Sequence, residues 1–157
     1  MTHASDCATN NAPALPAAPP GSKMVQVAPD WVDLVRQWHE AFGVPVQAAP
    51  TFDQKRVDLR LDLMEEEMTE FIDACNEEDS VKVLHEAADL IYVILGAMLE
   101  FGLGQHLDAA FREVARANMS KLGADGKPIY REDGKVLKGP NFTPADIRAV
   151  LDRASVP

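Results

Sequence analysis

The chain has 157 residues, 46% of them hydrophobic, and its 25 acidic and 15 basic residues give a formal net charge of −10. That length and composition are typical of one globular domain with a real core. The acidic balance argues against nucleic-acid binding, which requires clustered Lys and Arg, and the longest apolar run, residues 87–99, is too short to span a bilayer.

The first residues and the cysteines indicate the compartment. Neither a basic segment nor an apolar leader opens the chain, so we expect a cytoplasmic location. Cys7 and Cys75 lie in unlike surroundings, and no disulfide is expected.

Residues 1–24, rich in Pro and Ala, cannot bury enough surface to offset the entropy of ordering. They are predicted to be a disordered head before a single helical domain at 25–157.

Two helices are predicted in the first half of that domain. The first begins at Asp30, a possible N-cap, and ends near Phe42, where Gly43 follows as a C′ glycine. The second begins at the capping-box pattern of residues 51–54 and runs to about Asn76.

The acids of the second predicted helix lie on two different sides of it. Glu66, Glu67 and Glu70 share one arc with Leu59 and Leu63, which predicts that this side is packed against a neighbour. A solvated face is the common interpretation of an acidic helix, but it would not interleave leucines with glutamates. The helix is also predicted to have a solvent strip of Asp62, Glu65, Thr69 and Asp73 and an apolar face of Val57, Leu61, Met64, Met68, Phe71, Ile72 and Cys75.

The third predicted helix begins near Asp79 or Ser80 and ends at Phe101. Glu86 and Asp89 lie three residues apart on one stripe of a helix that is otherwise apolar nearly all round. Burying two unpaired carboxylates costs several kcal/mol. The apolar circumference predicts that a partner helix, from a second copy of the chain, covers part of it.

The last part of the chain is predicted to hold two helices and a basic loop. A helix at 105–121 faces inward with Leu107, Ala110, Phe111 and Val114, and it turns Arg112 and Arg116 outward or toward a ligand. Turn signals then predict a loop or short hairpin at 122–142, and residues 143–146 predict the start of a terminal helix at about 144–154. The fold class is therefore all-α, with four to five helices per protomer completed by oligomerisation.

The acidic spacing favours a metal site for hard cations. If the second and third helices are antiparallel neighbours, Glu67 with Glu70 and Glu86 with Asp89 each present two carboxylates one turn apart, and Glu66 adds another. Oxygen donors of this kind suit Mg²⁺ or Mn²⁺, which also accept phosphate oxygens.

Other chemistries find less support in the sequence. A di-iron bundle would require Glu three residues before a histidine, but Lys82 precedes His85 and Leu103 precedes His106 at that spacing. His85 is interpreted as a helix-surface or interface residue. No P-loop and no nucleophile elbow is present.

These residues carry a family resemblance. The segments at 66–71 and 86–93 resemble the paired Glu-x-x-Glu and Glu-x-x-Asp signature of the MazG-like all-α nucleoside triphosphate pyrophosphohydrolases, which include phosphoribosyl-ATP pyrophosphohydrolase and dimeric dUTPases. The resemblance continues through residues 117–121, 125–127 and 138–142, and it covers roughly residues 30–150. The presence of all these segments in this order is a more specific sign of the family than a single Glu-x-x-Glu motif.

The resemblance implies a homodimer or a dimer of dimers that cleaves a (deoxy)nucleoside triphosphate to the monophosphate and pyrophosphate. Two or three Mg²⁺ or Mn²⁺ ions would bind the five acids Glu66, Glu67, Glu70, Glu86 and Asp89, with Glu66 or Glu67 accepting a proton from the attacking water. The residues implied for substrate binding are Asn118, Lys121, Lys127, Lys135 and Lys138.

The resemblance leaves the substrate open among several nucleotides. Related compact enzymes occur in bacteria and phages, which implies the host cytoplasm if a phage encodes the chain, and a purine deoxynucleotide such as dGTP is slightly favoured. Phosphoribosyl-ATP and dUTP are alternatives. A non-enzymatic helical interaction module, whose carboxylates bind a structural cation or only keep the surface soluble, is the alternative from a different class.

Overall fold

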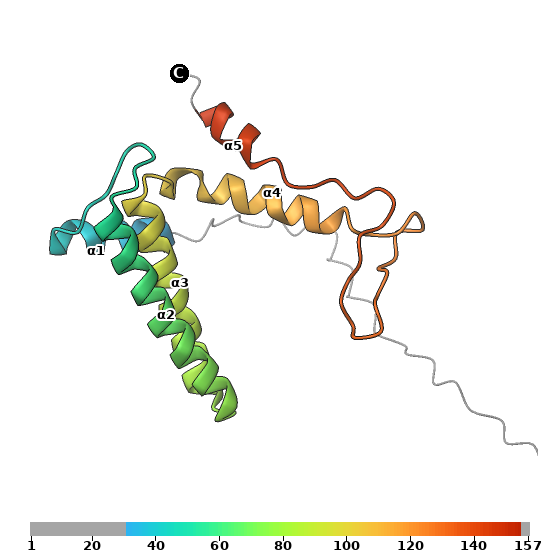
Figure 1. Cartoon of the computed structure of the whole chain (residues 1–157), viewed down its shortest axis with the longest axis horizontal. Coiled ribbons are helices and arrows are strands. Elements are labelled where there is room, and N and C mark those ends of the chain that lie inside the picture. The colour runs from blue at the N-terminus through green and yellow to red at the C-terminus, as the bar shows by residue number, and fades with distance from the viewer. Residues whose placement is uncertain (1–30, 155–157) are drawn as a thin grey trace, which may run out of the picture.

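A computed structural model of the chain describes residues 31–154, and Figure 1 shows their arrangement. The helices are α1 (Trp31–Phe42), α2 (Gln54–Asn76), α3 (Ser80–Glu100), a 3₁₀ turn η1 (Gly104–His106), α4 (Leu107–Met119) and α5 (Ile147–Ala154). Within these residues the only β pairing is one isolated antiparallel bridge between Tyr130 and Val136. The predicted all-α class is thus confirmed, as is the short hairpin after α4. The predicted head at 1–24 and the cap at Asp30 lie outside the described residues.

Aspartates fix the starts of α2 and α3. The Asp53 side chain accepts the backbone N–H of Arg56 at 3.1 Å, so Asp53 and not Thr51 caps α2. Asp79 caps α3 by accepting the N–H groups of Val81 at 2.9 Å and Lys82 at 3.3 Å. These bonds satisfy donors that have no partner inside a helix.

The core lies where α1 crosses the hairpin of α2 and α3. Val35 of α1 and Leu95 and Leu99 of α3 form the buried cluster, and partly buried apolar side chains surround it, namely Val32, Val46 and Leu107. Figure 1 shows α2 and α3 running side by side as a long hairpin that extends well beyond α1. Within residues 31–154, the far part of the hairpin is therefore packed mainly by the contact of α2 with α3.

The apolar face predicted for α2 is confirmed in part, since Val57, Met64 and Phe71 are half-buried. Leu61, Met68 and Ile72 of that face are 56%, 45% and 51% exposed. The most buried positions of the helix are Arg60 and Ala74, and Glu67, midway between them, is half-buried. The prediction of a packed side beside the glutamates is confirmed for Leu63 and Glu67, which are half-buried, and is wrong for Leu59, Glu66 and Glu70, which are exposed.

A buried ion pair ties α1, α2 and α3 together at the upper end of the hairpin. The carboxylate of Glu100 accepts Arg60 Nη2 at 2.6 Å and Arg56 Nε at 2.6 Å. Arg60 Nη2 also lies 3.1 Å from His39 Nε2, and His39 Nδ1 lies 3.0 Å from the carbonyl oxygen of Pro45. We call Glu100, Arg56, Arg60 and His39 the charged hub.

The chain turns sharply between α3 and α4. Gly102 has a φ of +69°, and a Cβ there would lie 2.0 Å from the carbonyl oxygen of Ala49, so only glycine fits. The α3 and η1–α4 segments meet at a bend of 113°, and α4 with the following hairpin forms an arm pointing away from α2 and α3 (Figure 1). Phe111, predicted to face inward, is 72% exposed, because α5, which contacts α4, does not cover it.

No single helix within residues 31–154 is both long and apolar enough to cross a bilayer. Only α3 and η1–α4 taken together, as a pair bent by 113°, have that length and composition.

The terminal helix begins later than predicted, at Ile147 in place of residue 144. Thr143 and Pro144 are held by α4, because the Thr143 N–H donates to Ser120 Oγ at 2.9 Å and Arg116 Nη2 donates to the Pro144 carbonyl at 2.9 Å. The Asp146 side chain then accepts the N–H of Ala149 at 2.9 Å. The N-terminal cap of α5 is therefore aspartate rather than Thr143.

Candidate metal centre

Carboxylates from both helices of the α2–α3 hairpin lie close together. Glu67 and Glu70 of α2 and Glu86 of α3 each offer an oxygen, and these atoms lie within 4.8 Å of one another. The spacing of three places Glu67 and Glu70 one turn apart, and the antiparallel hairpin brings Glu86 opposite them. The structure therefore brings together acids that are 16 or more positions apart in the sequence.

A second group shares Glu86 and adds residues of α3 alone. Donor atoms of His85, Glu86 and Asp89 also lie within 4.8 Å of one another. Glu86 thus links the two groups into one cluster, which we call the carboxylate cluster: Glu67, Glu70, Glu86 and Asp89, with His85 at its edge. Glu66, predicted as a further ligand, is exposed and belongs to neither group.

The electrostatics of the cluster are those of crowded, partly buried acids. Burial raises the pKa of Glu67 above its ordinary value, and the charges of Asp89, Glu70, Glu66 and Glu86 raise it further. No Lys or Arg lies between residues 62 and 79 to oppose them. A divalent cation would relieve this repulsion, and the donor set fits one, because carboxylate oxygens are the ligands that Mg²⁺ and Mn²⁺ prefer.

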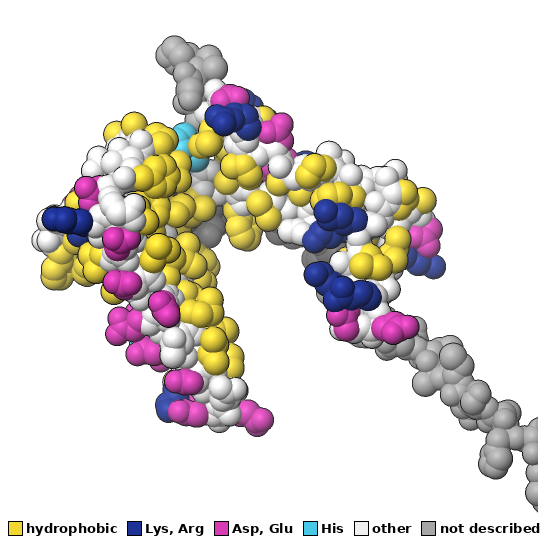
Figure 2. Space-filling model, viewed as in Figure 1, with side chains coloured by type: hydrophobic (Ala, Val, Ile, Leu, Met, Phe, Trp, Pro, Cys, Tyr) yellow, Lys and Arg dark blue, Asp and Glu magenta, His cyan; other side chains and the backbone are white. Residues whose placement is uncertain are grey.

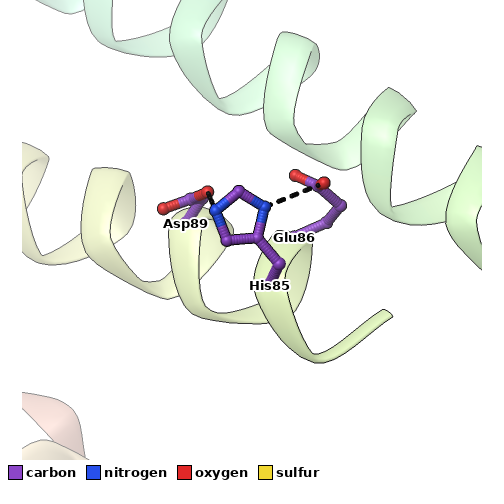
Figure 3. A group of neighbouring side chains, drawn as sticks. All are labelled: His85, Glu86 and Asp89. Carbon is purple, nitrogen blue, oxygen red and sulfur yellow. Dashed lines mark hydrogen bonds and ion pairs between the residues drawn. The ribbon is translucent and has the colours of Figure 1, made fainter. Parts of the chain in front are cut away.

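His85 was interpreted from the sequence as a helix-surface residue, which its 71% exposed side chain confirms, but it was not predicted to lie at the edge of this site. Figure 3 shows its ring between the two acids of α3, with Nδ1 3.1 Å from Glu86 Oε1 and Nε2 3.3 Å from Asp89 Oδ2. The hydrogen bond to Glu86, followed by the charge of Asp89, raises the pKa of His85. Its position next to Glu86 and four residues before Asp89 was the available signal, since residues four apart share a helix face.

The predicted substrate-binding residues lie elsewhere in the protomer. Asn118 and Lys121 lie at or just after the end of α4, and the three lysines of the hairpin follow them, at positions 127, 135 and 138. Figure 2 shows the acids gathered on the α2–α3 hairpin and bases gathered at the far end of the arm. One chain does not bring the two sets together.

The arginines of α4 are already paired. Arg112 Nε donates to Asp108 at 2.8 Å, and Arg116 donates to Glu113 at 2.8 Å. The prediction that they point outward is consistent with their exposure. In contrast, the amine of Lys138 lies 4.4 Å from the centre of the Phe142 ring, a cation–π contact that leaves its charge available.

Comparisons with known proteins agree with this geometry. A family model described as phosphoribosyl-ATP pyrophosphohydrolase matches residues 35–118, more than half of the chain, and this range includes the whole carboxylate cluster. An uncharacterized protein of Acanthamoeba polyphaga mimivirus, L479, is 35% identical over 128 residues, which cover 77% of this chain and 47% of the relative. The chain therefore spans about half the length of that relative.

Proposed function

Because the chain belongs to the phosphoribosyl-ATP pyrophosphohydrolase family, within the MazG-like superfamily that its sequence resembles, we propose that it hydrolyses a (deoxy)nucleoside triphosphate to the monophosphate and pyrophosphate. The observation that carries the proposal is the carboxylate cluster, in which oxygens of Glu67, Glu70 and Glu86 lie within 4.8 Å of one another. That density of acids, with no Lys or Arg among them, suits the binding of metal ions and phosphate together.

The residues of the cluster have distinct parts in this proposal. Glu70, Glu86 and Asp89, with Glu67, would hold two or three Mg²⁺ or Mn²⁺ ions, which when bound neutralise phosphate charge and activate water. Glu67 is the acid best placed to accept a proton, since it is half-buried and faces the other carboxylates, whereas Glu66 is exposed. Glu66 is proposed to act only through its charge.

The substrate is proposed from the family and the resemblance. A purine deoxynucleotide such as dGTP is the first to test, and phosphoribosyl-ATP and dUTP are the alternatives. The protein has a net charge of −10, which repels the phosphates of a nucleotide. The phosphates can therefore bind at this acidic cluster only through the bound metal ions.

A second copy of the chain is proposed to complete the site. The protomer leaves large apolar side chains exposed on α3 and on the arm, including Val81 at 79%, Leu84 at 74%, Phe111 at 72% and Met119 at 67%. Exposure of this extent is typical of an interface. In a homodimer or a dimer of dimers, the arm of one protomer would bring its predicted substrate-binding residues to the carboxylate cluster of another: Asn118, Lys121, Lys127, Lys135 and Lys138.

The activity is tested by incubating the protein with each common NTP and dNTP, and with phosphoribosyl-ATP, in Mg²⁺ or Mn²⁺. Release of pyrophosphate together with the monophosphate is expected for at least one of them. Glu70→Gln and Asp89→Asn should each abolish that release while unfolding at nearly the wild-type urea concentration. Glu65→Gln is the matched control, because Glu65 is an exposed acid of α2 outside the cluster.

Turnover of none of these substrates would refute the proposal. A wild-type level of release from Glu70→Gln would refute the assignment of the cluster as the metal site. Full activity after chelation of divalent ions would refute the metal requirement.

The shared site is tested by mixing two inactive variants. Glu70→Gln lacks an acid of the cluster, and Lys138→Ala lacks a base of the arm. If the arm acts on the partner's cluster, refolding the two variants together should restore part of the activity that each lacks alone. Activity lost in both and not restored in the mixture would place the two residues in the same protomer's site.

A further inference from the structure

His85 of α3 lies at the exposed edge of the carboxylate cluster. Its side chain is 71% exposed, compared with 43% for Asp89 and 15% for Glu86. The two ring nitrogens face different acids (Figure 3), because Nδ1 lies 3.1 Å from Glu86 Oε1 and Nε2 lies 3.3 Å from Asp89 Oδ2. The imidazole is therefore placed between two predicted metal ligands, while most of the side chain remains open to solvent.

The contact with Glu86 decides which ring nitrogen is available to a metal ion. An ionised carboxylate can only accept a hydrogen bond, and the shorter of the two contacts, from Nδ1 to Glu86, is a hydrogen bond. Histidines that bind a metal through one ring nitrogen commonly donate the other N–H to a carboxylate in this way. With its proton on Nδ1, the neutral ring presents the lone pair of Nε2 to Asp89 Oδ2, which is also an acceptor. Two facing acceptors repel each other unless a positive charge lies between them.

The distance between Nε2 and Asp89 Oδ2 matches that between two ligands of one metal ion. Divalent ions of this kind lie about 2.0–2.2 Å from their nitrogen and oxygen ligands. Two such ligands at a right angle or a tetrahedral angle are then roughly 2.8–3.6 Å apart. The observed separation of 3.3 Å falls within this range. Both atoms can therefore bind one ion without movement of the helix.

A nitrogen ligand changes which ion the cluster prefers. The other donors, from Glu67, Glu70, Glu86 and Asp89, are carboxylate oxygens, which suit both Mg²⁺ and Mn²⁺. Imidazole suits transition metals, and the affinity of a mixed nitrogen and oxygen site rises from Mn²⁺ to Co²⁺. Mg²⁺ gains little from a nitrogen, because it is a hard ion that binds oxygen. His85 therefore distinguishes ions that the carboxylates bind alike.

Resting on the proposed function, we propose that His85 Nε2 and Asp89 together bind one metal ion of the cluster, and that the nitrogen makes this position select Mn²⁺ over Mg²⁺. Glu86 orients the ring through Nδ1, and its second oxygen stays available to the ions held with Glu67 and Glu70. Water and the phosphates of the nucleotide fill the remaining positions around the ion. His85 is thus the residue that determines the choice of metal.

Metal affinities measured without nucleotide provide the first test. Mg²⁺, Mn²⁺ and Co²⁺ are each titrated calorimetrically into the full chain, as wild type, His85→Gln and His106→Gln, after far-UV circular dichroism has shown that each is folded. In His85→Gln the affinity should fall by about 10-fold or more for Co²⁺, by a smaller factor for Mn²⁺, and by less than about twofold for Mg²⁺. His106→Gln is the matched control, because it removes a histidine that lies outside the cluster, and it should bind all three ions as wild type does.

The gradation among the three ions separates a metal ligand from a residue that acts through its charge. All three ions are divalent, so the loss of a charge or of a hydrogen bond at position 85 would change the three affinities by the same factor. Equal changes for all three ions, or no change for any of them, would overturn the proposal.

Pulsed EPR of bound Mn²⁺ provides the second test, because a directly coordinated imidazole nitrogen modulates the electron spin echo of the ion. The modulation should be present in wild type and in His106→Gln, and it should be lost in His85→Gln. Wild-type protein with Mn²⁺ bound and no nitrogen modulation would overturn the proposal. A modulation that persists in His85→Gln would assign the nitrogen to another histidine and overturn it as well.

These measurements fail independently of the proposed function, because neither requires turnover. Nitrogen modulation that depends on His85, in a protein that hydrolyses no triphosphate, would refute the proposed function and leave His85 as a metal ligand. Hydrolysis by a protein whose bound Mn²⁺ shows no imidazole nitrogen would refute this inference and leave the function.

Discussion

Replacing Glu100 by glutamine is expected to destabilise the folded protein by about 3–5 kcal/mol, the usual cost of removing one partner of a buried ion pair. The Glu100 side chain is 1% exposed, and it accepts hydrogen bonds from both Arg56 and Arg60 in the charged hub. Glutamine has nearly the same shape but no charge, and it presents an N–H₂ group to arginines that have only donors. Two guanidinium groups would then face each other without an anion.

The structure indicates which arginine accounts for most of the cost. Arg60 has a side chain that is 7% exposed and cannot turn to water, whereas Arg56 is 34% exposed and can. Removing Arg56 alone, as Arg56→Gln, should therefore cost no more than about 1.5 kcal/mol. The double variant Arg60→Met, Glu100→Leu should be closer to wild type than Glu100→Gln is, because it leaves no unpaired charge deeply buried.

Urea unfolding followed by far-UV circular dichroism measures these differences, with all variants at one protein concentration so that association contributes equally. A Glu100→Gln variant within 1 kcal/mol of wild type would refute the argument, since it would mean that water reaches Arg60 in solution. A double variant less stable than Glu100→Gln would show that apolar side chains cannot replace the hub.

The ion pairs of Glu100 with Arg56 and Arg60 also predict how the stability of the fold depends on pH. Burial alone would raise the pKa of Glu100, but the hydrogen bonds from Arg56 and Arg60 outweigh it, and the pKa lies below its ordinary value of 4.5. A lowered pKa in the folded state means that the stabilisation is fully present above about pH 4.5 and is lost as the pH falls through the lowered value. Glu100→Gln should lack this part of the acid sensitivity.

Three further predictions concern helix ends and the arm. Asp79→Ala should cost about 1 kcal/mol in urea unfolding, because α3 loses its N-cap. The hydrogen bond from Arg116 lowers the pKa of Glu113 to about 2, and Glu113 also accepts the N–H of Asp146 before α5. The amides of α5 should therefore be less protected, relative to an unfolded peptide at the same pH, in Glu113→Gln, and in wild type as the pH falls from 4.5 toward 2. Gly139→Ala would place a Cβ 2.2 Å from the carbonyl oxygen of Leu122, and it should make the hairpin lysines more sensitive to trypsin.

The helices could be predicted from the sequence because their signals are local. The period of apolar residues and the aspartate caps predicted α3 from residue 79 or 80 to 101, and the structure has Ser80–Glu100. The carboxylate pairs could be predicted for the same reason, since a spacing of three on a helix fixes which side chains are neighbours. Only the antiparallel pairing of α2 with α3 had to be assumed.

The predictions that were wrong concern contacts between one helix and the segments that pack against it. The second helix has apolar residues on more than one side, and periodicity alone does not indicate which side α3 will bury. Leu61 and Ile72 are exposed, while Arg60, which a hydrophobic pattern ranks as polar, is buried. The predicted start of α5 was wrong for a related reason. Arg116 of α4 and Ser120, which follows α4, hold by hydrogen bonds the segment that would have formed the first turn.

Glu100 and Glu67 show how the fold uses the same side chain in two ways. Both glutamates lie between α2 and α3, and burial raises the pKa of each. At Glu100 two arginines reverse that effect and fix the ion in place, which stabilises the crossing of α1 on the hairpin. At Glu67 the neighbours are other carboxylates, which add to the effect. Opposed environments of this kind separate structural acids from acids that are available for chemistry, which is why we assign stability to the hub and propose the cluster as the functional site.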